Sequence, residues 1–479
     1  MPLPIDYPPH PQASSIKPYS PKLLQPWADS AILFILCGCI LMTATIAGAL
    51  HADESGAPTS LMGGRYYTFI ALIRVNQIEV SRTHNAGNDE AGLHTLAGVQ
   101  NVRDNFGKAF PGGRMTWAFS WLALNDQRPT YVAIRKQMKE YHERFGDEIT
   151  FIPGAYFAPM YNSREQVNRD LHDGLQLVSH MVGGGYRPKC VIAGFLAAEN
   201  MRYLAKEEGI HVVQGDIWSQ YGVDNGDGDG SISYPYYPSL EHFCKPAQGT
   251  NDFIDCVCLD GWTCDFLGAR RVGFQGGFNS RMGLGPIETL LGLGHDRGLE
   301  EQIFTTGLHF DDGFKRNGFA WVTAIWEVSL GADLFNDLPE FGREVRQRWP
   351  NVHAVTEGEF GELFRKQFPD NNKLDDRFVE RGSGIGGSDK NLEIRWFMNK
   401  DFRLALIHDW TKPNDPELVL DFTRYDLKAK EPQEIGNRNW SLMNEINQKG
   451  TRPQDKPVPL SKLSADDQAI IHERLPELK

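Results

Sequence analysis

Two carboxylates and an aromatic ring stand close together in Asp260-Gly-Trp-Thr-Cys-Asp265. The apolar run 253–259 before them reads as a strand, whose two-residue period places Asp260 on the same face as Cys258. An acid and a base or nucleophile beside an aromatic plate are typical of sugar chemistry. Asp260 and Asp265 are therefore candidate catalytic residues and Trp262 a candidate substrate-binding residue. The alternative is that these carboxylates cap helices or lie on the surface.

His309 and Asp311 follow another predicted strand, Ile303–Leu308, and share a face by the same period. Such a pair can bind a metal or transfer a proton, although a hydrogen-bonded structural histidine is the alternative. We assign Asp311 as a candidate catalytic residue and His309 as a candidate substrate-binding residue. Glu79, near the end of the first predicted strand, is a further candidate carboxylate, with a structural ion pair to a nearby arginine as the alternative.

Asp227 and Asp229 alternate with glycines in Asn225-Gly-Asp-Gly-Asp-Gly230, which is similar to the start of a calcium loop. The twelfth position is Tyr236 and not glutamate, so a full EF-hand is excluded. A looser calcium site, or a turn held by side-chain hydrogen bonds of the aspartates, remains. The sequence identifies no cofactor with certainty. A divalent cation, Ca²⁺ or Zn²⁺, is left as an open alternative.

The spacing and number of the cysteines indicate buried thiols and not a metal site. Cys256 and Cys258 are separated by one residue, which is not the usual zinc spacing, and no matching histidine pair follows. Five cysteines lie beyond residue 64, and an odd number excludes a complete disulfide framework. Buried thiols that pack as small apolar groups are the simpler interpretation.

The composition points to a neutral ligand. The net charge of −13 offers no basic surface for many phosphates, so nucleic acid is a poor partner. Trp218 precedes the aromatic run Tyr234-Pro-Tyr-Tyr-Pro238, and aromatic side chains in loops line sugar clefts or cover a barrel end. We expect a polysaccharide or oligosaccharide partner, with Trp218 as a candidate substrate-binding residue.

The elements that position these residues follow a repeated pattern of apolar strand, turn and amphipathic helix, which is typical of βα units. Seven or eight such units favour an α/β barrel, whose active face is formed by the carboxyl ends of the strands. The predicted strands are 67–80, 115–122, 149–156, 189–193, 211–214, 253–259, 271–275 and 303–308. The predicted helices include 128–145, 163–181, 199–208 and 285–293.

The pattern fades after Trp349, so we predict a barrel domain at 65–349 and a smaller C-terminal domain at 350–479. The C-terminal part has β-like stretches and a final short helix. These lie at 392–397, 402–408, 418–422 and 464–475.

The N-terminus indicates export. Residues 31–50 are uncharged and apolar, and as a helix they span about 30 Å, the thickness of a bilayer core. Lysines precede this segment and acidic residues follow it, which places residues 1–30 in the cytoplasm and the body outside. Ala47-Gly-Ala49 also reads as a signal-cleavage site. A linker at 51–64 follows, and membrane contact is expected only if the segment is not cleaved.

Several long motifs resemble the bacterial domain-of-unknown-function family 3863, and others resemble its C-terminal companion, family 3864. The first set is 194–200, 259–265 and 279–288, and the second is 393–399, 421–425 and 439–444. The resemblance implies a distorted (β/α)7-type barrel, similar to the glycoside hydrolase and polysaccharide deacetylase superfamily, with a smaller β-containing C-terminal domain. Within or beside these motifs and strand ends, Glu199, Arg281 and Tyr156 are candidate substrate-binding residues.

Comparison with that superfamily separates its two branches. The deacetylase branch has a Thr-Phe-Asp-Asp strand and a His-x₃-His metal pair, and neither stands in this chain. The stretch Phe195–Glu199 is closer to the Pro-Glu segment of α-glucan-acting barrels. We therefore expect an extracytoplasmic carbohydrate-active enzyme, a glycoside hydrolase with paired carboxylates at the barrel rim. A non-catalytic carbohydrate-binding barrel and a metal-dependent, deacetylase-like hydrolase are the alternatives.

Overall fold

The computed structural model describes residues 58–80, 82, 84–153, 157–216, 230–271, 282–285, 287–329, 332–437, 439–442, 446 and 456–479. The predicted segments 1–30 and 31–50 and the first part of the linker 51–64 lie outside this part. No helix within the described ranges is long and apolar enough to cross a membrane.

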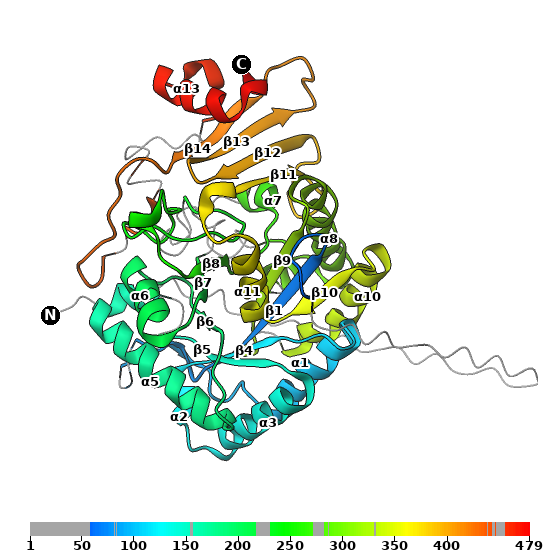
Figure 1. The fold of residues 1–479 in the computed structure, drawn as a ribbon. Helices are drawn as coiled ribbons and strands as arrows, with labels where there is room; N and C mark the ends of the chain where they lie inside the picture. The colour runs from blue at the N-terminus through cyan, green and yellow to red at the C-terminus, as the bar shows by residue number, and fades with distance from the viewer. Residues whose placement is uncertain are drawn as a thin grey trace, which may run out of the picture. The chain divides into compact units, whose positions relative to one another are not determined.

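Two parallel sheets form the larger part of the fold (Figure 1). In the first sheet β9 lies along one edge of β1, while β10 and then β4 follow its other edge, and β5 pairs with β4. In the second sheet β7 lies between β6 and β8. The first sheet contains β1 (Arg65–Ile73), β4 (Thr116–Phe119), β5 (Glu148–Phe151), β9 (Ala320–Glu327) and β10 (Val352–Val355), and the second contains β6 (Cys190–Ile192), β7 (Val212–Asp216) and β8 (Val257–Asp260).

The two sheets approach each other at both edges. Thr150, on β5, donates its hydroxyl to the carbonyl oxygen of Cys190, on β6, at 2.5 Å. Beyond the end of β8, the backbone N–H of Thr263 donates to the carbonyl oxygen of Thr323, on β9, at 3.1 Å. The strand ladders of the described residues do not form a continuous ring, so a closed barrel stays a prediction. The mixed α/β architecture with parallel strands is confirmed.

The helices begin where their sequences carry N-terminal capping signals. Thr95, Ser163 and Ser464 accept backbone N–H bonds at three helix starts, and Thr356 forms a capping box with Glu359. The helices are α1 (Leu96–Ala109), α2 (Trp121–Asn125), α3 (Pro129–Phe145), α4 (Ala158–Tyr161), α5 (Arg164–Val182), α6 (Ala198–Tyr203), α7 (Phe266–Arg271), α8 (His295–Gly307), α9 (Phe314–Asn317), α10 (Leu338–Arg348), α11 (Glu357–Gln367) and α13 (Ala465–Arg474).

The core contains both faces of β1, which is buried almost throughout. One face contacts outer helices, since Tyr67 stacks on Phe110 at 4.8 Å between ring centroids. On the other face Thr68 donates to Glu357, the first residue of α11, at 2.8 Å. α11 also packs closely on β7 and therefore joins the first sheet to the second.

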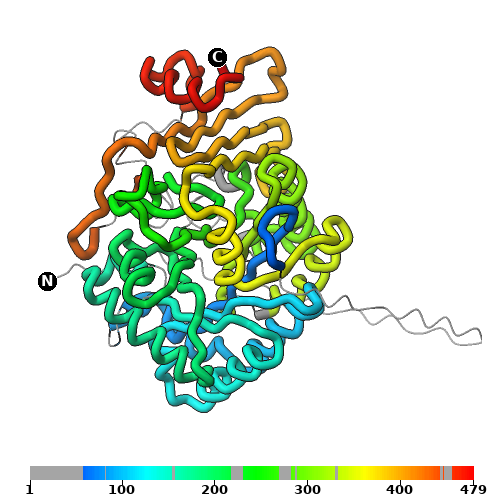
Figure 2. Tube along the Cα trace, in the orientation of Figure 1, coloured from blue at the N-terminus to red at the C-terminus, as the bar shows by residue number. Residues whose placement is uncertain are grey.

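The C-terminal part forms a separate antiparallel sheet (Figure 2). Phe397 and Phe422 face a small core with Ile471 of α13, whereas Trp396 and Leu420 belong to the main core. The sheet is therefore apolar on both sides. Its strands are β11 (Asp375–Arg381), β12 (Leu392–Asn399), β13 (Phe402–Asp409), β14 (Leu418–Arg424) and β15 (Val458–Pro459).

Two strand predictions differ from the structure. Ile303–Leu308 lies in α8 and at the start of the π-helix 308–313 that follows it. Arg271 ends α7, and 272–275 lie outside the described residues. The sequence prediction also missed β9 and β10. β10 lies after residue 350 but pairs with β1 in the first sheet. The antiparallel sheet begins at Asp375. The domain boundary at 349/350 stays a prediction.

Candidate functional site

Two aspartates end neighbouring parallel strands. Asp216 is the last residue of β7 and Asp260 the last of β8, and their Cα atoms are partners in the ladder. The backbone N–H of Gly261 donates to the carbonyl oxygen of Asp216 at 3.0 Å. Both side chains are buried, with at most 2% exposed. In a parallel sheet the carboxyl ends of strands are the usual place for catalytic residues.

The two carboxyl groups lie on the same face of the sheet. Asp216 Oδ2 is 3.7 Å from Cys258 Sγ, and Cys258 shares its face with Asp260 by the two-residue period. A bulge between Gln214 and Asp216 shifts the register at this point, and bulges often re-aim side chains beside active sites. The two aspartates therefore end neighbouring strands side by side.

Burial sets the protonation of Asp216. It raises the pKa of Asp216 to about 7, although the hydrogen bond from the Tyr236 hydroxyl, at 2.5 Å, favours the ionised form and opposes this rise. Arg403, on β13, acts in the same direction as Tyr236. A carboxyl group that changes charge near neutral pH can serve as an acid or a base.

Trp262 follows this pair directly. Its backbone N–H donates to Asp260 Oδ1 at 3.3 Å, and its side chain is 6% exposed. The next residue, Thr263, accepts the backbone N–H of Thr323 on its hydroxyl at 2.9 Å. The turn after β8 is therefore held against β9, which keeps Trp262 beside the carboxylates.

A second group of charges lies at the carboxyl ends of β1 and β9. Arg74 donates to Glu90 at 2.6 and 2.8 Å and pairs with Glu327 at 3.0 Å. Ser329 donates to Glu90 at 2.7 Å. Glu327 is the last residue of β9, and its side chain is 17% exposed. The sequence prediction did not include Glu327, which ends the strand that it missed.

Glu79 holds local backbone together, and its assignment as a catalytic residue stays a prediction. Its two carboxylate oxygens accept the backbone N–H groups of Val75, Asn76 and Leu122 and the hydroxyl of Ser120, all within 3.3 Å. Burial raises the pKa of Glu79, and these four hydrogen bonds oppose the rise. The carboxylate joins the turn after β1 to the start of α2.

Asp265 stands five positions after Asp260 in the sequence, but its partners lie on other elements. It accepts the backbone N–H of Gly268 at 2.9 Å and interacts with Glu301 on α8 and Glu380 on β11. Burial, and then Asp265, raise the pKa of Glu301 to about 9. Asp265 therefore belongs to a buried carboxyl cluster beside the antiparallel sheet, and the structure does not bring it to the ends of β7 and β8.

His309 and Asp311 lie at the other end of the strands. Both are in the π-helix 308–313, where a two-residue period no longer puts them on one face, so that argument is wrong. Asp311 accepts the indole N–H of Trp349 at 2.8 Å and attracts Arg65, the first residue of β1. His309 is buried beside the Tyr234 hydroxyl, 3.3 Å away.

Glu199 is exposed on α6 and lines a surface cavity of about 310 Å³ with Arg202 and Lys206. The cavity is lined by residues of α5, of α6 and of the π-helix 204–208. The other predicted site residues lie outside the described residues and keep their status as predictions. They are Tyr156, Trp218, Asp227, Asp229 and Arg281.

The metal prediction has no support within the described ranges. There, no group of three or more histidine, cysteine or acidic side chains is placed to hold an ion. The cysteines at 190, 244, 256, 258 and 264 are buried and form no disulfide. A Ca²⁺ site at Asp227 and Asp229 stays a prediction.

Sequence reasoning missed Asp216, although a signal was present. Val212-Val-Gln-Gly-Asp216 and Val257-Cys-Leu-Asp260 are both short apolar strands that end in aspartate. The predicted strand 211–214 stopped two residues before Asp216. In the structure Gly215 stays in β7, where an added Cβ would meet Met201 at 2.5 Å.

The fold and the strand-end carboxylates define the class: a mixed α/β protein with parallel sheets, an antiparallel C-terminal sheet and an acidic site at the carboxyl ends of the strands. The model of domain of unknown function 3863 matches residues 59–398, and that of domain of unknown function 3864 matches 403–478. The chain belongs to the DUF3863 family and carries a DUF3864 region at its C-terminus.

A solved structure from Parabacteroides distasonis, described as a candidate glycoside hydrolase/deacetylase, is similar throughout. It shares 49% identity, with a TM-score of 0.83, over 88% of this chain and 100% of its own. A branching enzyme of type GH57 from Pyrococcus horikoshii has 11% identity and a TM-score of 0.37 over 63% of this chain and 71% of its own. The peptidoglycan deacetylase PdaC from Bacillus subtilis has 9% identity and a TM-score of 0.31 over 64% of this chain and 93% of its own. These two likenesses are too weak to support an argument. The comparison with curated proteins found no match.

Proposed function

We propose that this protein is a carbohydrate-active hydrolase, with Asp216 and Asp260 as its paired catalytic carboxylates. The observation that carries the proposal is their pairing at the carboxyl ends of β7 and β8, with the pKa of Asp216 near 7. Glycoside hydrolysis needs one carboxyl group that is protonated and a second that is ionised. The description of the 49% identical relative as a candidate glycoside hydrolase/deacetylase supports the same class.

In the proposed reaction Asp216 is the acid. Its proton passes to the glycosidic oxygen as the bond to the anomeric carbon breaks, and Asp260 attacks that carbon to form an ester. Water, deprotonated by Asp216, then hydrolyses the ester and restores both groups. Retaining enzymes of this kind have carboxyl groups about 5 Å apart, whereas inverting enzymes have them ~6.5–9.5 Å apart, and we propose the retaining course.

Trp262 gives the site an aromatic side chain, whose face can pack against the apolar face of a sugar ring. The net charge of −13 favours a neutral glycan over a strongly anionic one, because like charges repel. We therefore propose a neutral polysaccharide or oligosaccharide as the substrate. The bond cleaved is between sugars, which separates this proposal from a deacetylase.

We also propose that the protein acts outside the cytoplasm, because of the apolar segment 31–50. Fractionation of cells that make the full chain tests this proposal. We expect the folded body to be digested by protease added to spheroplasts. Protection of the body until the cells are lysed would contradict export.

A screen of the purified protein against neutral glycans tests the activity, with reducing ends and free acetate measured in the same reactions. We expect new reducing ends from at least one glycan, no acetate, and unchanged rates after EDTA treatment. Acetate release that EDTA abolishes would favour the metal-dependent deacetylase. Glycan binding that raises the melting temperature without any product would favour the non-catalytic alternative.

A further inference from the structure

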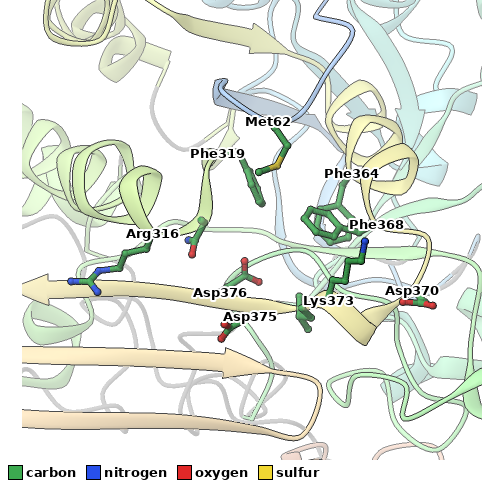
Figure 3. Close-up of a pocket in the computed structure, with 11 residues that line it drawn as sticks. Met62, Arg316, Phe319, Phe364, Phe368, Asp370, Lys373, Asp375 and Asp376 are labelled. Carbon is green, nitrogen blue, oxygen red and sulfur yellow. The ribbon is translucent and has the colours of Figure 1, made fainter. Parts of the chain in front are cut away.

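A cavity of about 200 Å³ lies at the opposite end of the strands from the proposed active site (Figure 3). Met62 and Phe319 line it, and they stand shortly before β1 and just before β9, so the cavity is where these strands begin. Phe364 of α11 and Phe368 just after it add two more aromatic rings. These four side chains give the cavity an apolar part, beside polar and charged lining residues.

Asp376, on β11, contributes a carboxyl group to this cavity. Figure 3 shows it pointing from the strand toward the aromatic residues. The side chain is 6% exposed, and within the described ranges no donor reaches its Oδ2 atom. Burial, and then the neighbouring Asp375, raise the pKa of Asp376 well above its usual value. A buried carboxyl oxygen without a donor is costly unless a ligand supplies one.

The cationic side chains near this cavity pair with other carboxylates or point away from Asp376. Arg316 donates to Asp312 at 2.6 Å, and Arg377 donates to Asp375 at 3.0 Å. Lys373 is exposed, and Figure 3 shows its amine on the Phe368 side of the cavity, away from Asp376. Asp376 therefore shares the cavity with aromatic side chains and with the Asn317 amide, while the lining cations lie elsewhere.

We propose that this cavity binds a small organic ammonium ion with a compact apolar body, whose amine donates to Asp376. An ammonium group provides both the missing hydrogen bond and a positive charge, and charge-assisted bonds of this kind are the strongest in proteins. Phenylalanine rings attract cations over their faces and pack against apolar groups. A cavity of 200 Å³ is below the usual range for drug-sized ligands, which sets the size at about one ring.

Calorimetric titration of the full chain with cyclohexylamine and cyclohexanol tests this site. The two probes have nearly the same shape and differ in charge at pH 7. We expect cyclohexylamine to bind the wild-type protein at least about tenfold more tightly than cyclohexanol. This preference requires no variant, so it stays testable whatever a substitution does to folding.

Three variants locate the binding. Asp376→Asn removes the charge and nearly keeps the shape, so we expect at least about tenfold weaker binding of cyclohexylamine. Met62→Trp fills the cavity from an exposed position and should block both probes. Asp415→Asn, an exposed carboxylate outside the cavity, is the matched control and should leave the affinity unchanged.

Equal affinity of the wild-type protein for the two probes, or no binding of either, would overturn the proposal. Tight binding of cyclohexylamine that persists in folded Asp376→Asn would also overturn it, because the amine would then sit elsewhere. The proposed hydrolase does not depend on this cavity, so either idea can fail without the other.

Discussion

At the scale of single residues, the hydroxyl of Tyr236 controls the proposed acid. It donates to Asp216 at 2.5 Å and stabilises the ionised carboxylate, so it holds the pKa of Asp216 below the value that burial alone would give. In Tyr236→Phe this bond is lost, and the pKa of Asp216 rises. The acid then stays protonated to higher pH, and the alkaline limb of the pH–rate profile should move up by about one unit. A limb that stays in place or moves down would contradict the role of Asp216.

The same scale shows what alternation along a strand can predict. It placed Asp260 at the end of β8 correctly, because that position depends only on the local strand. It could not predict that Asp216 pairs with Asp260, which depends on the register between β7 and β8. The sequence could not show the four hydrogen bonds to Glu79, because their donors come from turns that only folding brings together.

At the scale of elements, α11 packs directly on β7. A Cβ added at Gly361 would lie 2.3 Å from Val212 Cγ1, which is far inside normal contact. Gly361→Ala should therefore lower the free energy of unfolding by about 1–3 kcal/mol, despite the better helix propensity of alanine. Gly292→Ala is the control, because Gly292 is exposed with no atom within 4 Å of an added Cβ. Denaturant unfolding of both variants measures this, and equal stabilities would contradict the close packing.

The elements that sequence reasoning misassigned have a common physical cause. Ile303–Leu308 contains apolar and threonine residues that suit a strand, but tertiary packing placed it in α8. Helices such as α3 and α5 were predicted nearly to the residue, because their glycine and serine ends are local signals. The antiparallel strands β12, β13 and β14 were also predicted, because the apolar patterns of these short strands are local signals too.

At the scale of the whole molecule, a buried carboxyl cluster lies between α8 and the antiparallel sheet. Glu301 accepts the Ser383 hydroxyl at 2.6 Å, and its pKa of about 9 lies well above the usual 4.5. The folded state therefore binds more protons than the unfolded state between pH 4.5 and 9. Stability should fall as pH rises through this window, by up to about 1.4 kcal/mol per pH unit from this group.

Glu301→Gln keeps a neutral side chain at every pH, so it should flatten this decline and be more stable than the wild type at pH 8. Glu300→Gln, at an exposed neighbouring position on α8, should leave the decline unchanged. Unfolding curves from pH 5 to 9 measure both. A decline equally steep in Glu301→Gln would show that Glu301 does not retain its proton. No sequence pattern could predict this cluster, because its members come from three distant segments.

The most direct test of the central claim is the rate of glycan hydrolysis in Asp216→Asn and Asp260→Asn. Each variant should lose about a thousandfold in kcat, and the double variant should lose little more, because the two groups act as one unit. Asp255→Asn is the matched control, since Asp255 stands just before β8 at its other end and pairs with Arg365. It should retain nearly full activity. If folded Asp216→Asn and Asp260→Asn keep rates within about threefold of the control, the paired-carboxylate site is wrong.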